Sequence, residues 1–355
     1  MPDLQSRELE IRYEASDQFV PILQHLNATL LVSTYKLGRV AVLQPGVSSS
    51  GNGKLSVQFR AFPQAMGIAV SPDRLAIGTS RSVWQFERPR GVAIPDREGR
   101  LSKVAYLPRR QRITGNISIH EMAWQNDELW AVNTLFSCLC TFDDSHNFVP
   151  RWKPRFISQL RPEDRCHLNG LAMGPSGPTY VSALGQGDHQ GSWRDDKLNG
   201  GCLLDVASSE VVLAGLAMPH SPRIHDGHLW YLHSGHGEIN RVDLQSGQSE
   251  TIERVPGYTR GLSFAGQFAF VGMSQIRETN VFGGLPIGQN PDALRCGVAV
   301  VDLVSGRSVA WFQFKCDVEE VFAVEVVPNS TPLVLHSPTL EDDDKEVWVV
   351  PPLPS

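Results

Sequence analysis

Two histidines, an asparagine and a glutamate occupy matching positions in a pattern that repeats along this chain of 355 residues. They are His120, Asn169, His220 and Glu320. Imidazole nitrogens with carboxamide and carboxylate oxygens form a mixed ligand set that suits Zn, Mn or Fe, or Ca if fewer imidazoles bind. The residue types therefore predict a divalent metal cofactor without fixing its identity.

Three further polar residues could act on a substrate: Glu121 and His167 lie beside these positions, and Arg260 occupies the same position in its own repeat. Glu121 or His167 could serve as general base on a metal-bound water or on an acidic C–H bond. The planar guanidinium of Arg260 matches a carboxylate or phosphate, so we expect it to hold an anionic group of the substrate. The competing interpretation is a wet channel whose polar residues only hydrogen-bond water.

The repeat that carries these residues is clearest at 166–206. A polar start and an apolar strand at 166–172 lead through a turn at 174–177 to a strand at 179–183, and after a loop to a strand at 201–206. Similar starts lie at Met66, His120, His220, Arg260 and Glu320. A spacing of about 40 to 60 residues is typical of propeller blades with loop insertions.

We predict an all-β fold, a six-bladed β-propeller formed as one domain by residues 28–355, after an N-terminal arm at 1–27. Strands within 28–43 would complete the last blade and so remove free sheet edges. A seven-bladed ring would result if residues 28–62 formed a blade of their own. The sixth repeat would supply strands at 333–336 and 347–350.

In such a ring, the inner strands begin on the face that carries the loops between the second and third strands. Two of these loops are long, at 185–197 and from 276 to about 295. Loops of such length usually have a function in a compact fold, and we expect them to cover the channel mouth. The predicted substrate-binding residues of this face are Arg81, Asn133, His189, Trp193, Arg194, His233, His236, Tyr258 and Arg277.

The composition excludes some kinds of partner. Lys and Arg number 32 against 38 Asp and Glu, without a basic cluster, so nucleic acid is not expected. No apolar run approaches the roughly 18 residues of a membrane span, and the first residues lack the features of a secretion signal. The six cysteines include no C-x-x-C pair and are expected to be buried thiols in a reducing compartment, which indicates a cytoplasmic protein.

Five stretches, at 33–36, 120–124, 167–172, 219–223 and 256–262, resemble one conserved-hypothetical bacterial family of unknown function, sometimes fused to tetratricopeptide repeats. The resemblance covers nearly the whole chain and implies no activity. The chain also has a more distant similarity to gluconolactonase-type six-bladed propellers, which bind an axial divalent metal through Glu and Asn side chains. This resemblance implies that Glu320 and Asn169 are metal ligands. His120 and His220 depart from that oxygen-rich set.

Our first functional hypothesis is a metal-dependent hydrolase, lyase or isomerase that acts at the channel mouth. Its substrate would be a small polar or anionic molecule, or a peptide side chain. The alternative is a non-catalytic propeller that binds a protein or glycan partner on the same face, which would be an argument from fold alone.

Overall fold

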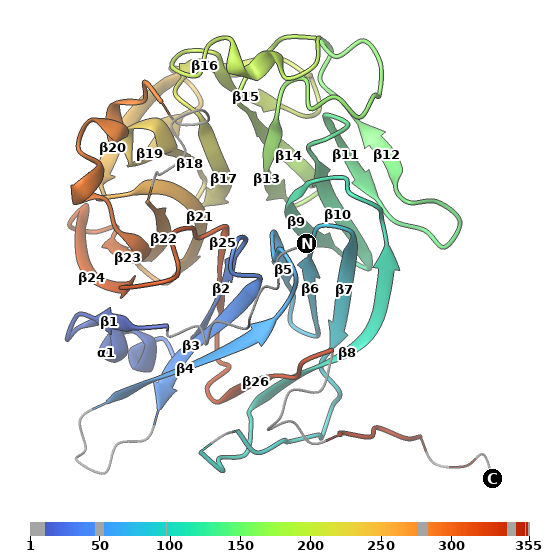
Figure 1. The fold of residues 1–355 in the computed structure, drawn as a ribbon, viewed down its shortest axis with the longest axis vertical. Coiled ribbons are helices and arrows are strands. Elements are labelled where there is room, and N and C mark those ends of the chain that lie inside the picture. Colours follow the sequence, from blue (N-terminus) through green and yellow to red (C-terminus); the bar gives the residue numbers. More distant parts are fainter. Residues whose placement is uncertain are drawn as a thin grey trace, which may run out of the picture.

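Six antiparallel sheets stand around a common axis as the blades of a β-propeller, as the computed structural model shows (Figure 1). The structure describes residues 11–46, 53–96, 98–275, 283–338, 346–351 and 353. Each blade has four strands that run from the axis outward. The predicted all-β class and the count of six blades are confirmed.

The first four blades each use consecutive strands, which follow one another from the axis outward. The first blade has β5 (Ile68–Val70), β6 (Arg74–Gly78), β7 (Ser82–Glu87) and β8 (Val104–Ile113). The second has β9 (Ile119–Gln125), β10 (Glu128–Asn133), β11 (Cys138–Thr141) and β12 (Val149–Trp152). The third has β13 (Leu168–Gly174), β14 (Gly177–Ala183), β15 (Gly201–Asp205) and β16 (Val211–Leu216). The fourth has β17 (Pro219–His225), β18 (His228–His233), β19 (Glu238–Asp243) and β20 (Gln248–Arg254).

The last two blades involve both ends of the described chain. The fifth blade has β21 (Tyr258–Ala265), β22 (Phe268–Ser274), β23 (Cys296–Asp302) and β24 (Arg307–Phe314), with β1 (Tyr13–Ala15) added at its outer edge. The sixth has β25 (Ala323–Val327) at the axis, followed by β2 (Thr29–Thr34), β3 (Arg39–Gly46) and β4 (Lys54–Ala61). The N-terminal strands therefore close the ring, as the sequence predicts.

The second strand predicted for the sixth repeat is wrong. The sequence pattern predicts residues 333–336 beside the inner strand, but β2 pairs with β25 there over five residues. The chain instead crosses to the first blade, where β26 (Leu333–Leu335) pairs in parallel with the outer strand β8. Residues 347–350 form no strand.

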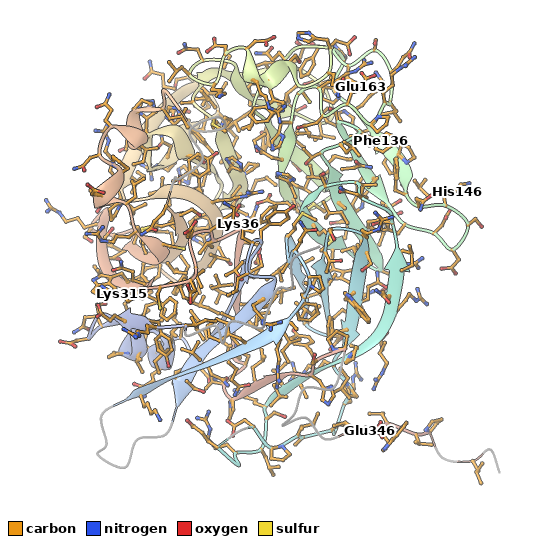
Figure 2. The ribbon with its side chains drawn as sticks, in the orientation of Figure 1. Lys36, Phe136, His146, Glu163, Lys315 and Glu346 are labelled. Carbon is orange, nitrogen blue, oxygen red and sulfur yellow. The ribbon has the colours of Figure 1, made fainter. Side chains whose placement is uncertain are left out.

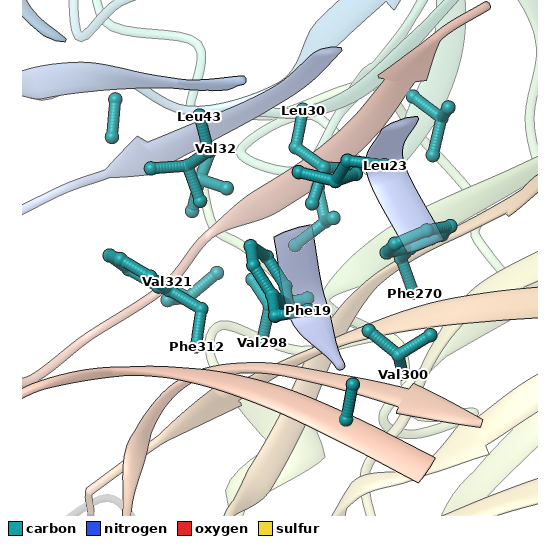
Figure 3. Packing of buried hydrophobic residues seen from close by; sticks show 14 of the residues in the cluster. Phe19, Leu23, Leu30, Val32, Leu43, Phe270, Val298, Val300, Phe312 and Val321 are labelled. Atoms are coloured by element: carbon teal, nitrogen blue, oxygen red, sulfur yellow. The ribbon is translucent and has the colours of Figure 1, made fainter. Parts of the chain in front are cut away.

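A cluster of buried apolar side chains joins the fifth and sixth blades (Figure 3). The helix α1 (Phe19–His25) contributes Phe19 and Leu23, both fully buried, and Phe19 lies 5.9 Å from the ring of Phe312 in β24. The N-terminal segment is therefore packed into the ring through α1 and β1. Within the described ranges, no helix has the length and apolar character that a membrane span requires.

Glycines allow the inner strands to come close together around the axis. A Cβ at Gly170 would lie 2.2 Å from Pro222 of the next blade, and one at Gly67 would lie 2.4 Å from the carbonyl oxygen of His120. In each blade, the turn between the second and third strands lies at the end of the channel where the inner strand begins. Lys36, in the turn between β2 and β3, lies near the centre of the ring, whereas His146 and Lys315 lie at its periphery (Figure 2).

Candidate functional site

His120 and His220 are held in the same way in alternate blades. Each side chain is buried at the start of an inner strand, β9 or β17. The Nδ1 atom of His120 lies 3.1 Å from the carbonyl oxygen of Ser118 and 2.8 Å from the hydroxyl of Thr134. The Nδ1 atom of His220 lies 3.0 Å from the carbonyl oxygen of Met218 and 3.0 Å from the hydroxyl of Ser234.

These contacts define the tautomer of both rings. A carbonyl oxygen can only accept a hydrogen bond, so Nδ1 must carry the proton and Nε2 must keep its lone pair. The hydroxyls agree with this assignment, because Thr134 and Ser234 donate to carbonyl oxygens of the next blade and are left to accept from the imidazoles. Both rings therefore keep an Nε2 lone pair that can accept a hydrogen bond or bind a metal.

The two imidazoles are kept neutral by their surroundings. Burial lowers the pKa of His120 well below its usual value, and the charges of Arg260 and His167 lower it further. Burial and Arg260 lower the pKa of His220 in the same way. Both histidines therefore act as neutral hydrogen-bonding groups near Arg260 and His167.

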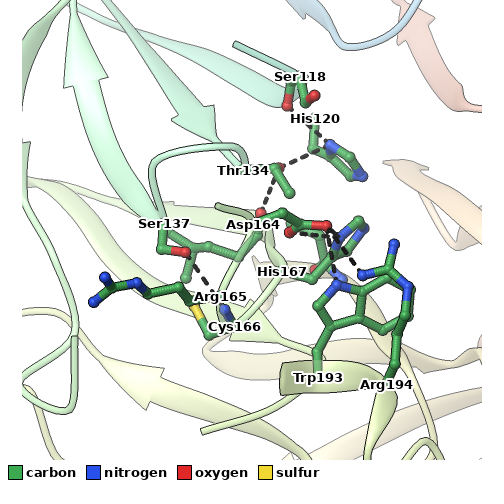
Figure 4. Close-up of polar contacts among 12 residues, drawn as sticks. Ser118, His120, Thr134, Ser137, Asp164, Arg165, Cys166, His167, Trp193 and Arg194 are labelled. Carbon is green, nitrogen blue, oxygen red and sulfur yellow. Dashed lines mark hydrogen bonds and ion pairs between the residues drawn. The ribbon is translucent and has the colours of Figure 1, made fainter. Parts of the chain in front are cut away.

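His167 forms a pair with Asp164 immediately before β13 (Figure 4). Its Nδ1 atom lies 2.9 and 3.0 Å from the two carboxylate oxygens of Asp164, so it donates a proton to them and Nε2 is the basic nitrogen. The backbone of His167 is left-handed, with φ of 49°. Its ring meets that of His120 edge-on, with centroids 4.8 Å apart.

The loop at 185–197 covers this pair and is firmly attached. Trp193, in the 3₁₀ helix η1 (Ser192–Arg194), is buried and donates from Nε1 to Asp164. Its ring packs against that of His167, with centroids 4.5 Å apart and planes tilted by 45°. Arg194 lies over the Trp193 ring at 4.0 Å (Figure 4). Arg165 anchors the start of the loop through Asp188 at 2.6 Å. Residues of this loop therefore pack against His167 and Asp164, and its role as a cover of the channel mouth stays a prediction.

Arg260 lies on an aromatic ring contributed by the sixth blade. Its Cζ atom lies 3.3 Å from the ring centroid of Phe322, which also contacts His120 at 5.2 Å. Glu320 is 3.5 Å from the guanidinium, which is longer than a good hydrogen bond. Burial lowers the pKa of Arg260, although Glu320 opposes that shift. We call His120, His167, His220, Arg260 and Glu320 the mouth cluster.

Two of the predicted site residues are committed to other contacts. The carboxamide of Asn169 accepts from Ser182 and donates to the carbonyl oxygen of Pro219, so both of its ends are used within the fold. Glu121 accepts from the backbone N–H of Leu171 at 2.7 Å and pairs with Arg223 at 2.9 Å. Among the described residues, no three His, Cys, Asp or Glu side chains form a group that could hold a metal ion.

Glu121 belongs to a second polar layer that crosses the channel. Arg223 of the fourth blade bridges Glu121 of the second blade and Glu325 of the sixth, the latter at 3.4 Å. Burial raises the pKa of Glu325 to about 7 against the opposing influence of Arg223. The two carboxylates raise the pKa of Arg223 despite its burial. We call these three residues the axial triad.

The remaining predicted residues fall into several settings. His233 accepts at Nε2 from the backbone of Ala217 and faces Glu238, so its ring is structural, and His236 in η2 (Ser234–His236) packs on it at 4.4 Å. Tyr258 is buried edge-on to His220. Asn133 is buried and accepts a hydrogen bond from the backbone of Phe136 in the following turn. Arg81 and His189 are exposed, and His189 pairs with Asp195. Arg277 lies outside the described residues.

Several residues of the site could not be recognised from the first strand of each repeat, although two signals for them exist. Thr134 and Ser234 each follow their histidine by 14 residues, so aligning the repeats beyond their first strand would find both. Asp164 precedes His167 by three residues, a short spacing that a left-handed turn brings together. Phe322, Arg223 and Glu325 lie on or beside inner strands, where the sequence marks them only by their position in the repeat.

Comparison with known proteins establishes the family and the fold. A family model described as "Domain of unknown function (DUF4915)" matches residues 17–335. No curated protein matches the chain. A structure titled "Crystal structure of Nidogen/Laminin Complex" is similar with a TM-score of 0.53 and 10% identity, covering 84% of this chain and 98% of that one. A protein of unknown function from Bacteroides caccae is similar with a TM-score of 0.50 and 9% identity, with the same coverage.

Proposed function

We propose an activity for this chain, which belongs to the family described as Domain of unknown function (DUF4915). It is an enzyme that binds a small anionic substrate at the channel mouth and removes a proton from it. Such a step begins many lyase, isomerase and hydrolase reactions. The observation that carries the proposal is the pair of His167 and Asp164 beside the neutral His120.

His167 is the general base in this proposal. Asp164 holds its Nδ1–H, which fixes the ring orientation and stabilises the imidazolium that forms when Nε2 takes a proton. Trp193 donates to the same carboxylate and covers one face of the ring, so the base sits in a partly water-excluded setting. Glu121 is not assigned this role, because Arg223 and the Leu171 backbone occupy its carboxylate.

The other members of the mouth cluster bind the substrate. Arg260 is the only permanent cation in the cluster and takes the anionic group. His120 and His220 accept hydrogen bonds at Nε2 from substrate hydroxyl or amino groups. Because the pKa of each is lowered, neither ring becomes a second positive charge that would oppose protonation of His167.

The metal-dependent form of this activity stays a prediction. His120 and His220 offer Nε2 atoms whose Nδ1–H groups are held by carbonyl oxygens, an arrangement that also suits metal-binding histidines. Asn169 is occupied and Glu320 faces Arg260, so the other two predicted ligands fit a metal less well. No step of the proposed proton transfer depends on a metal.

Deuterium exchange tests the proposal without knowledge of the full reaction. Purified protein is incubated in D₂O with a mixture of 2-hydroxy acids, 2-amino acids and sugar phosphates, and mass spectrometry detects exchange of C–H for C–D. The wild-type protein should label at least one anionic compound. His167→Asn should reduce this exchange by about 10²-fold or more, the range expected for loss of a general base.

Two variants and one metal measurement complete this experiment. His146→Asn removes an exposed histidine at the periphery of the ring and should leave exchange unchanged. Exchange that persists in His167→Asn would overturn the assignment of the base. Elemental analysis beside a His120→Ala/His220→Ala double variant decides the role of metal: about one equivalent in wild type only would favour the metal-dependent form.

The binding alternative remains a prediction with its own outcome. A non-catalytic propeller would show no exchange and would lose its protein or glycan partner after changes in the loop at 185–197, while His167→Asn would bind normally. The relation to gluconolactonase-type propellers and the fusion to tetratricopeptide repeats are likewise predictions that the comparisons do not address.

A further inference from the structure

Two arginines of the channel mouth pack on aromatic rings, and their guanidinium N–H groups make no hydrogen bond to the described residues. Arg260 lies on Phe322 at 3.3 Å, and Arg194 lies on Trp193 at 4.0 Å. Their nearest carboxylates are at 3.5 Å for Arg260 and 3.9 Å for Arg194. In the part of the chain that the structure describes, neither guanidinium makes a hydrogen bond to another residue, and Nη2 of Arg260 is buried without a partner.

Other arginines of this protein show what a structural role looks like. Arg165 donates to Glu163 at 2.8 Å and to Asp188 at 2.6 Å. Arg223 donates to Glu121 at 2.9 Å and to two backbone carbonyl oxygens. A buried donor without a partner is unfavourable, so a ligand that accepts a hydrogen bond from Nη2 of Arg260 would be stabilised there.

A continuous series of side-chain contacts joins the two arginines. It runs from Arg194 through Trp193, His167, His120 and Phe322 to Arg260, with ring centroids of neighbours 4.5, 4.8 and 5.2 Å apart. Arg194 is half exposed at the outer end, whereas Arg260 is largely buried at the inner end. The proposed base, His167, belongs to this series, and Figure 4 shows it beside Trp193 and Arg194.

We propose that the substrate is a dianion with an anionic group at each end, such as a dicarboxylate, that lies along this series of side chains. This inference rests on the proposed function and names its substrate class. Arg260 binds one end and Arg194 binds the other, each through the planar fork that suits a carboxylate or phosphate. The atoms between the ends then lie beside Nε2 of His167 and of His120.

The two arginines have different parts in binding. Arg260 is fixed between Phe322 and Glu320, so it sets the position of the first anionic group. Arg194 is carried by the covering loop and shares Asp164 with His167 and Trp193. A dianion therefore ties the loop to the inner end of the site, while a monoanion leaves Arg194 unused.

Calorimetric titration with carboxylates tests the inference. The probes are the series of dicarboxylates from succinate to suberate, each compared with the monocarboxylate of the same chain length. One dicarboxylate should bind at least about tenfold more tightly than its monocarboxylate, since a charge-assisted hydrogen bond contributes on this scale. Arg194→Gln should remove that difference and leave monocarboxylate binding unchanged.

A matched variant and a second site variant separate the outcomes. Arg241→Gln removes another arginine that lies on a tryptophan, Trp230, far out on the fourth blade, and should change nothing. Arg260→Lys, which keeps the charge, should weaken both probe classes. If both classes bind equally in wild type and Arg260→Lys weakens both, only the dianion inference fails. If no carboxylate binds, or if Arg260→Lys leaves the affinity of both classes unchanged, the proposed function fails as well.

Discussion

The mouth cluster and the axial triad are built from the same inner strands, and both place charged groups in a protein interior. In the triad, the charged groups are paired with one another. Arg223 forms ion pairs with Glu121 and Glu325, and Glu121 also accepts a hydrogen bond from the backbone N–H of Leu171. In the mouth cluster, the buried guanidinium of Arg260 has an open N–H group, and the Nδ1–H bonds of two histidines leave Nε2 basic.

This difference separates a structural polar group from one prepared for a ligand. Burial of a charge is unfavourable unless partners replace water, so removal of one partner from a paired set leaves an uncompensated charge and destabilises the fold. A set with open donors and acceptors has a higher free energy until something binds. The two layers should therefore respond differently to mutation.

Removal of the shared cation should have the largest effect. Arg223→Met leaves Glu121 and Glu325 facing each other without a counter-charge, and we expect a loss of about 3–5 kcal/mol in the free energy of unfolding. Arg260→Met removes a poorly paired guanidinium and should lose less than about 1 kcal/mol. Urea denaturation at neutral pH measures both. Equal losses would mean that the two layers do not differ in this way.

The charge on Glu325 should make stability depend on pH. Its pKa in the folded protein is raised to about 7 from an ordinary value of 4.5. The folded state thus holds this proton more tightly than the unfolded state, so the stabilisation is complete below about pH 4.5 and is lost as pH rises through 7. The full loss should be about 3 kcal/mol, because the two pKa values differ by about 2.5 units at roughly 1.4 kcal/mol each.

Glu325→Gln should abolish this part of the pH dependence, so that the variant is more stable than wild type at pH 8. Denaturation curves at several pH values give the measurement. Glu121→Gln is the matched control, because that carboxylate has stronger partners, and it should destabilise the protein at pH 8. If the free energy of unfolding of Glu325→Gln changes with pH as it does in the wild type, the prediction is contradicted.

A smaller effect is expected from the hydroxyls that orient the histidines. Thr134→Val and Ser234→Ala each leave an imidazole N–H and a backbone carbonyl without a side-chain partner, for a loss of about 1–2 kcal/mol in each case. Nitrogen NMR of the rings should still show the Nδ1–H tautomer, which the carbonyl oxygens of Ser118 and Met218 fix, but with changed Nδ1 chemical shifts. Thr141→Val on β11, the third strand of the second blade, should leave those signals as they are.

Much of the fold could be predicted from the sequence because each blade repeats its own pattern. Strands near the axis such as β2 are buried along their whole length and appear as apolar runs, while the outer strand β20 is almost entirely polar. The exception is β26, which is apolar like a second strand but pairs in parallel with a blade that is distant in sequence. Local pattern cannot tell which sheet edge a strand will join.

The site was predictable only in part, for a related reason. Stacking the repeats identified His120, His220 and Arg260, because the ring symmetry converts sequence position into a place on the axis. It could not show that Asn169 is occupied by Ser182 and Pro219, since those contacts depend on the distance between blades. It also could not place Phe322 beneath Arg260, because an aromatic residue next to a strand is usually part of the core.

The closure of the sixth blade has a consequence for synthesis of the protein. Its three outer strands lie before residue 62, but its inner strand β25 ends only at Val327. A ribosome must therefore translate nearly the whole described chain before the ring can close. Glu320 and Phe322, which position Arg260, belong to that last segment. Nascent chains should therefore acquire their blades progressively but gain the ability to bind a ligand in one late step.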